Sequence, residues 1–171
     1  MILPLLLALV SSAPDRACPI EAAAALPELV GTWQVLQIHG LDRPRPDSVR
    51  ASSVFIPELQ RCLLREQLRA DAGNPPYEGL MFWGANGPDG SIQRVFAHSQ
   101  HGGFGVYQGR RDGNTILLRQ LPAPGQPSTD VVENQVLIAD RDRFAITSRL
   151  SIDGGRTWRV LSRWEYRRTR S

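Results

Sequence analysis

The sequence contains no lysine, since all 20 of its basic residues are arginine, and these stand against 17 acidic residues. This absence excludes Schiff-base chemistry and every mechanism that needs a lysine nucleophile. The arginines supply planar guanidinium groups that can hold carboxylates or stack on aromatic rings. The net charge is only +3. Because most arginines alternate with acidic residues along the chain, we predict no nucleic-acid partner.

Long hydrophobic runs are also scarce. The apolar segment at residues 2–10 is about half the length that a transmembrane helix needs. It is followed by Ser11, Ser12 and Ala13, small residues typical of a signal-peptide cleavage site. We therefore predict a signal peptide at residues 1–13, no transmembrane segment, and an exported protein, periplasmic or secreted. Cleavage after Ser12 or after Ala13 remains open.

Cysteine is nearly absent, with only Cys18 and Cys62 in the chain. Two cysteines in an oxidising compartment favour one disulfide, which we expect to tie the N-terminal segment to an early strand. Chain entropy assigns such a bridge about 4 kcal/mol. Asp15 stands where lipid attachment to Cys18 would call for an apolar residue, so we predict no lipid anchor. No residues with metal-ligand spacing stand out, and we predict neither a metal nor a cofactor.

The rest of the chain has the pattern of an all-β protein. One short alanine-rich helix is expected at residues 21–30, broken at Pro27. Longer proline-containing loops are expected at residues 40–52 and 122–130. Short segments rich in β-branched and aromatic residues follow the helix, separated mostly by glycine with asparagine or aspartate. The predicted strands are residues 33–39, 61–69, 77–84, 91–99, 104–108, 115–121, 131–139, 143–152 and 158–167.

Strands at this spacing, joined mostly by tight turns, predict an antiparallel meander. Closing the meander removes its exposed edges, so we expect a lipocalin-like barrel of about 8–10 strands. The domain would span residues 28–171, after an N-terminal segment at 14–27. Alternation along the last strand places Trp158, Trp164 and Tyr166 on one face. Such a face suits an interior that is either packed or holds a ligand.

Two short motifs carry a family resemblance. Gly31-Thr32-Trp33 resembles the G-x-W opening of lipocalin-like (calycin) barrels, and Glu165-Tyr166-Arg167 resembles the ending of an uncharacterised bacterial family of such barrels. The likeness spans roughly residues 28–168. It implies a barrel closed by Trp33 at its base, with Arg167 packed on that ring in a cation–π contact of about 0.5–2 kcal/mol. Both residues would then be structural.

A third motif, Ser151-x-Asp153-x-Gly155-x-Thr157-Trp158, matches the Asp-box. In sialidase-like propellers this box recurs in several blades, whereas it occurs once here. We therefore interpret it as a hairpin in which Asp153 caps turn amides and Trp158 covers the turn. Neither residue is expected to take part in catalysis.

The leading functional hypothesis is a non-enzymatic protein that binds a small, largely apolar ligand inside the barrel. Cavities of this kind use few polar groups in a mostly apolar wall. The expected apolar interior residues are Trp33, Met81, Trp83, Phe96, Phe104, Trp158 and Trp164. The polar end of the ligand would be oriented by His39, Tyr107 or Arg149.

Two alternatives remain open from the sequence. A filled barrel could act as an interaction module of the cell envelope. A hydrolase, an isomerase or a haem-binding barrel could use His39 or His98, with Glu66 or Glu78 as a cavity carboxylate. His98 and His101 lie three apart, so they would point to opposite faces of one strand and converge only across a turn. Ligand identity and oligomeric state stay open.

Overall fold

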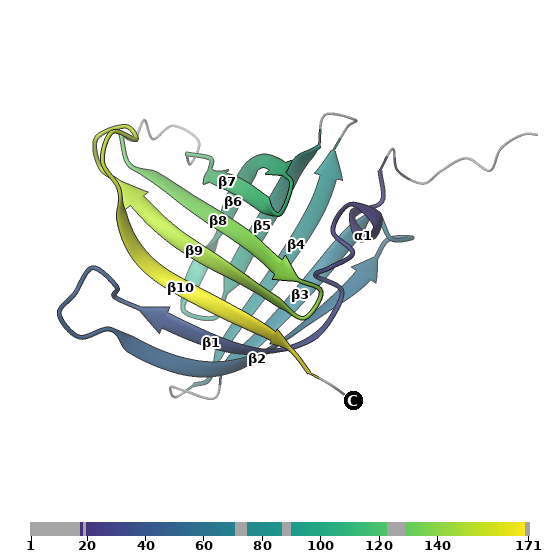
Figure 1. Ribbon diagram of the computed structural model, residues 1–171, viewed down its shortest axis with the longest axis horizontal. Coiled ribbons are helices and arrows are strands. Elements are labelled where there is room, and N and C mark those ends of the chain that lie inside the picture. The colour runs from purple at the N-terminus through teal and green to yellow at the C-terminus, as the bar shows by residue number, and fades with distance from the viewer. Residues whose placement is uncertain (1–17, 19, 71–74, 87–89, 123–128, 170–171) are drawn as a thin grey trace, which may run out of the picture.

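The computed structural model describes residues 18, 20–70, 75–86, 90–122 and 129–169, with the side chain of His101 excepted. The expected signal peptide at residues 1–13 lies outside these residues. Within them, the chain forms one short helix, α1 (Ala22–Ala25), and ten strands (Figure 1). The strands are β1 (Gly31–His39), β2 (Asp47–Glu58), β3 (Leu63–Ala70), β4 (Tyr77–Asn86), β5 (Ser91–His98), β6 (His101–Asp112), β7 (Thr115–Gln120), β8 (Val131–Asp140), β9 (Arg143–Ser151) and β10 (Arg159–Arg168).

The strands close into a barrel. Each strand pairs antiparallel with the next in sequence, and β1 also pairs with β10, from Trp33 opposite Arg168 to His39 opposite Ser162. Figure 1 shows β1 and β10 side by side at the point of closure. The predicted all-β meander barrel with one short N-terminal helix is therefore confirmed.

Strand β2 was not predicted. The expected loop over residues 40–52 is wrong from residue 47 onward, because Asp47–Glu58 pairs with β1 on one side and β3 on the other. Serine and arginine make this segment a weak strand by composition, and pairing along both edges decides its conformation. The predicted helix is also shorter than expected, since only four residues are α-helical.

The helical segment closes one end of the barrel. Leu26 and Leu29 are fully buried there, and the carbonyl of Leu29 accepts a hydrogen bond from Trp33 Nε1 at 2.8 Å. The guanidinium of Arg168 lies over the Trp33 ring, 4.2 Å from its centroid. The prediction that Arg167 fills this role is wrong. Residues two apart on a strand share a face, so Arg168 points to the same side of β10 as the buried Tyr166, whereas Arg167 points to the other side.

Arg168 also binds the closing segment directly. Its Nη1 and Nη2 donate to the carbonyls of Val30 and Glu28 at 2.7 and 2.8 Å, and its Nε donates to the carbonyl of Arg141 at 2.7 Å. Gly31 makes room for this, because a Cβ at that position would collide with Nη1, and its φ of 130° disfavours other residues. The glycine of the G-x-W motif thus permits the arginine to reach the tryptophan.

Three further contacts hold the closing segment. The predicted disulfide between Cys18 and Cys62 is present. The guanidinium of Arg61 lies 2.8 Å from the Glu21 carboxylate. Arg111, at the end of β6, donates to the Glu28 carboxylate at 2.8 and 3.1 Å and to the carbonyl of Ala25 at 2.8 Å.

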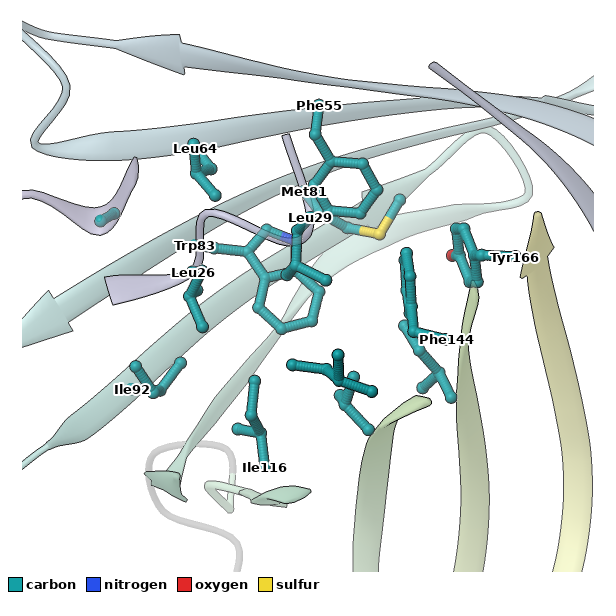
Figure 2. Packing of buried hydrophobic residues seen from close by; sticks show 14 of the residues in the cluster. Leu26, Leu29, Phe55, Leu64, Met81, Trp83, Ile92, Ile116, Phe144 and Tyr166 are labelled. Carbon is teal, nitrogen blue, oxygen red and sulfur yellow. The ribbon is translucent and has the colours of Figure 1, made fainter. Parts of the chain in front are cut away.

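A dense aromatic cluster fills the half of the barrel next to this closed end (Figure 2). Phe144 and Tyr166 stack with ring centroids 4.1 Å apart, and Trp33 meets Phe144 edge-on at 4.8 Å. Phe55 lies 6.0–6.2 Å from Phe144, Tyr166 and Trp83. Packing of this density leaves the closed half as a solid core.

Candidate functional site

A buried carboxyl group marks the upper limit of this core. Glu66 on β3 is fully buried, and its carboxyl oxygens accept hydrogen bonds from Ser53 Oγ at 3.0 Å, Trp83 Nε1 at 3.1 Å and Tyr166 Oη at 2.9 Å. Burial raises the pKa of the Glu66 carboxyl, while the charge of Arg94 and the three donors act in the opposite direction. Because these donors occupy both oxygens, Glu66 ties β2, β3, β4 and β10 together.

Arg94 lies above this layer and is only 3 % exposed. Its guanidinium lies over three rings, at 4.9 Å from the centroid of Trp83, 5.3 Å from Phe96 and 5.4 Å from Tyr107. Its Nη2 donates to the sulfur of Met81 at 3.6 Å. The Nε and Nη1 atoms are buried without a hydrogen-bond partner. A buried cation in this condition is costly, so the site calls for an anionic or acceptor group.

Arg94 forms part of the wall of a cavity of about 180 Å³. The indole Nε1 of Trp164, in the same wall, is likewise buried without a partner. The wall combines aromatic rings with hydroxyl and amide groups and includes no carboxylate. It is formed by Arg94, Phe96, Tyr107, Asn134, Ile146, Ser148, Ser162 and Trp164.

A second cavity, of about 400 Å³, lies toward the end of the barrel opposite α1. Gln37, 3 % exposed, has an unpartnered side-chain nitrogen there. Gln37 is the Cα partner of Trp164, which places the two cavities next to each other. The wall of the larger cavity consists of Gln37, His39, Val49, Ala70, Tyr77, His98 and Gln100. Its volume falls within the range typical of small-molecule sites.

Aromatic side chains separate the two cavities. Phe96 lies 6.4 Å from Trp164 and stacks on His98 at 5.1 Å, while His39 meets Trp164 edge-on at 6.3 Å. Burial lowers the pKa of His39 against the opposing charge of Asp47. Neutral imidazole is thereby favoured at the mouth of the barrel.

Burial also raises the pKa of Tyr77, in the same wall, to about 12. Its phenol therefore stays protonated at neutral pH and remains available as a hydrogen-bond donor.

Most of the predicted ligand-binding residues face the barrel interior. Phe96, Tyr107 and Trp164 line the smaller cavity, and His39 lines the larger one. Met81 and Trp83 are fully buried below Arg94. Trp33 belongs to the closed end, away from both cavities.

Phe104 does not face the interior. It is 77 % exposed, because alternation along β6 directs Tyr107 inward and Phe104 outward. The expectation of an interior ring at this position is wrong.

Arg149 and Trp158 were also expected in the barrel interior and do not lie there. Arg149 Nε donates to the buried carboxylate of Glu133 at 2.6 Å, and its guanidinium lies 4.5 Å from the Trp158 ring centroid. Arg149 lies on the outer face of β9, since alternation places it opposite Ile146 and Ser148, which line the interior. Trp158 is also outside, because a register shift between Val160 and Ser162 interrupts the alternation that would align it with Trp164. A β-bulge of this kind moves the residues before it onto the other face.

The Asp-box hairpin has the hydrogen bonds that its sequence implies. The Asp153 carboxylate accepts bonds from the backbone amides of Arg156 and Thr157, both at 2.9 Å, and from the Thr157 hydroxyl at 2.7 Å. These donors hold the pKa of Asp153 well below its usual range. Trp158 Nε1 donates to the carbonyl of Gly155 at 3.1 Å.

The proposed acid partners of the histidines are not beside them. Glu66 is engaged in the core, and Glu78 forms an ion pair with Arg69 at 3.2 Å on the outside of the barrel. Among the described residues, no group of three or more histidine, cysteine or acidic side chains is arranged to hold a metal ion.

Several residues of the smaller cavity were missed by the sequence interpretation, and Arg94 is the most informative. A usable signal existed, because Arg94 shares its strand face with Ile92 and Phe96. An arginine between two apolar residues on the apolar face of a strand indicates a buried charge. Asn134, Ser148 and Ser162 carry no comparable signal.

Comparison with known proteins supports the fold. No protein-family model and no curated protein sequence matches the chain. Among solved structures, Rv2717c from M. tuberculosis is similar with a TM-score of 0.64 at 19 % identity, over 88 % of this chain and 99 % of that one. The S-type phycobiliprotein lyase CPES from Guillardia theta has a TM-score of 0.58 at 12 % identity, over 90 % and 95 % of the two chains. The protein therefore has a calycin-like barrel fold.

The described residues contain no helix that is both long enough and apolar enough to span a membrane.

Proposed function

We propose that this protein is an exported, non-enzymatic binder of a small, largely apolar molecule held in the open half of its barrel. The observation that carries the proposal is the contrast inside the barrel. One half is a solid aromatic core, while the other contains cavities of about 180 and 400 Å³ walled by rings and a few polar groups. Apolar walls with few, well-placed polar groups are typical of ligand sites.

Export is part of the proposal. The bridge between Cys18 and Cys62 is compatible with an oxidising compartment, where such bonds persist. Catalysis by His39 or His98 has weaker support, because the carboxylates expected to assist them lie in the core or on the outside.

The first test is native mass spectrometry of the mature protein, purified gently from the exported fraction of its host. Excess mass that disappears on denaturation is the expected result. Titration with fatty acids and fatty alcohols then tests binding directly, with calorimetry as the readout. A clean apo mass together with no heat across the panel would contradict the proposal and would favour a barrel that acts through its surface.

A matched pair of variants locates the binding site. Ser148→Phe places a ring into the smaller cavity and is expected to weaken binding at least tenfold. Thr147→Phe adds the same ring to the opposite face of β9, since neighbouring residues of a strand point to opposite faces. Equal loss of binding in both variants would place the ligand elsewhere.

A further inference from the structure

The unpartnered polar atoms of the barrel interior share one property. Arg94 Nε and Nη1, Trp164 Nε1 and Gln37 Nε2 are all hydrogen-bond donors. Arg94 and Gln37 are each only 3 % exposed, so bulk solvent has little access to them. Because these unpartnered atoms are all donors, they favour a ligand that accepts hydrogen bonds.

The charge of the site points the same way. No carboxylate lines the smaller cavity, and Arg94 takes part in none of the ion pairs found among the described residues. Glu66, a buried acid in the layer below, already accepts three hydrogen bonds there. Arg94 and Glu66 interact through their charges without a hydrogen bond between them, so Nε and Nη1 of the guanidinium stay unpartnered in surroundings where charge interactions are stronger than in water.

We propose that the smaller cavity binds the carboxylate of a monoanionic amphipathic acid, with Arg94 as its charge partner and Trp164 Nε1 as a second donor. This inference rests on the proposed ligand-binding function and names the chemical class of the ligand. A single guanidinium matches one negative charge, which favours a carboxylate over a phosphate monoester of charge near −2.

The walls of the two cavities also accommodate the apolar part of such an acid. Phe96, Ile146 and Trp164 offer apolar surface around the donors. Val49 and Ala70 continue that surface in the larger cavity toward the mouth. In the proposed complex the carboxylate lies deep in the barrel at Arg94, and the hydrocarbon chain extends toward the mouth, which requires Phe96 and Trp164 to move aside.

The test compares dodecanoate with dodecan-1-ol, which have the same chain length and differ in the charged group. Isothermal titration calorimetry at pH 7.5 on the mature disulfide-bonded protein supplies the dissociation constants. Dodecanoate is expected to bind about 10- to 100-fold more tightly than the alcohol, the range typical of hydrogen bonds to a charged group.

Three variants assign this preference to residues. Arg94→Met is expected to remove the preference for the acid while binding of dodecan-1-ol persists. Trp164→Phe keeps a ring but lacks the indole N–H, and is expected to weaken dodecanoate binding about 3- to 10-fold. Arg110→Met removes one positive charge from the exposed side of the neighbouring strand and is expected to leave both affinities unchanged.

The outcomes separate the two proposals. Equal affinity of the wild-type protein for the acid and the alcohol overturns the carboxylate assignment and leaves ligand binding intact. No binding of either compound overturns the carboxylate assignment, and together with a clean apo mass and no heat across the wider panel it overturns both. An acid preference that survives Arg94→Met also overturns the assignment. If Arg94→Met does not fold, the wild-type comparison and Trp164→Phe decide the question by themselves.

Discussion

Arg168 and Arg94 lie over tryptophan rings at opposite levels of the same barrel, at 4.2 and 4.9 Å from the ring centroids. Arg168, at the closed end, donates to three backbone carbonyls. Arg94, in the open half, donates to the Met81 sulfur, and among the described residues its Nε and Nη1 find no hydrogen-bond partner. The same contact with an aromatic ring therefore accompanies a satisfied cation in one place and an unsatisfied cation in the other.

This difference indicates which of the two arginines stabilises the fold. At the closed end, the disulfide, the ion pairs of Arg61 and Arg111, and the bonds of Arg168 all hold the same short segment. In the open half, buried donors remain without acceptors. Hydrogen bonds to Arg168 stabilise the fold, whereas unpartnered buried donors destabilise it, and this contrast is the basis for proposing a ligand in the open half.

The largest expected effect comes from removing the covalent tie. Replacing both cysteines, Cys18→Ala with Cys62→Ala, frees a loop of 44 residues in sequence separation. We expect the free energy of unfolding to fall by about 4 kcal/mol, because the unfolded chain gains conformational entropy. Urea denaturation followed by circular dichroism measures this. A loss below about 1 kcal/mol would show that the closed end is held mainly by its non-covalent contacts.

The second prediction sets the two arginines against each other. Arg168→Met is expected to lower the free energy of unfolding by about 2–4 kcal/mol, since three carbonyls lose their charged donor. Arg94→Met is expected to change stability by less than about 1 kcal/mol or to increase it, since an unpaired buried charge is removed. Urea midpoints of the two ligand-free variants supply the comparison. Equal destabilisation would remove the distinction between the two ends.

The third prediction concerns how the stability of the protein depends on pH in the acidic range. Hydrogen bonds from Arg111 hold the pKa of Glu28 below its ordinary value of 4.5. The resulting stabilisation is complete above pH 4.5 and is lost as the pH falls through the folded pKa, because the unfolded chain binds the proton more readily. We expect Arg111→Met to lower the free energy of unfolding by about 1 kcal/mol at pH 7.

The measurement for this prediction is a series of urea titrations between pH 3 and pH 7 on both proteins. The stability difference between wild type and Arg111→Met should shrink steadily below pH 4.5. A difference that stays constant over this range would mean that Glu28 does not contribute to it.

The smallest effect is expected at the Asp-box hairpin. Asp153→Ala removes the acceptor of the Arg156 and Thr157 amides. We expect faster hydrogen exchange at these amides with little change in global stability, because the hairpin lies at the surface. Asp112→Ala offers a control at an exposed acid at the end of β6. Unchanged exchange at both amides would show that the turn is held by its glycines instead.

Sequence patterns predicted most of the fold but not all of it. Apolar alternation and turn residues located the strands other than β2, whose serines and arginine resemble a loop until β1 and β3 pair with its edges. The G-x-W motif correctly placed Trp33 at a closed end. The arginine on its ring is Arg168 instead of Arg167, since the motif shows that an arginine is near but not which face of β10 it occupies.

The site was predicted only in part. Phe96, Tyr107 and Trp164 were expected in the interior and line the smaller cavity. Trp158 and Arg149 were expected beside them, and the bulge in β10 between Val160 and Ser162 places Trp158 elsewhere. A bulge adds one residue without a sequence marker, so strict alternation fails on one side of it.

The sequence by itself determined the class of the protein. Its alternating apolar residues, its turns and its two cysteines specify a disulfide-tied β-barrel, because these depend on local periodicity and on residue counts. Only the tertiary structure decided which arginines are satisfied. Hydrogen-bond partners such as Arg168 and Val30 lie 138 residues apart in the chain, and the absence of a partner at Arg94 depends on every strand around it.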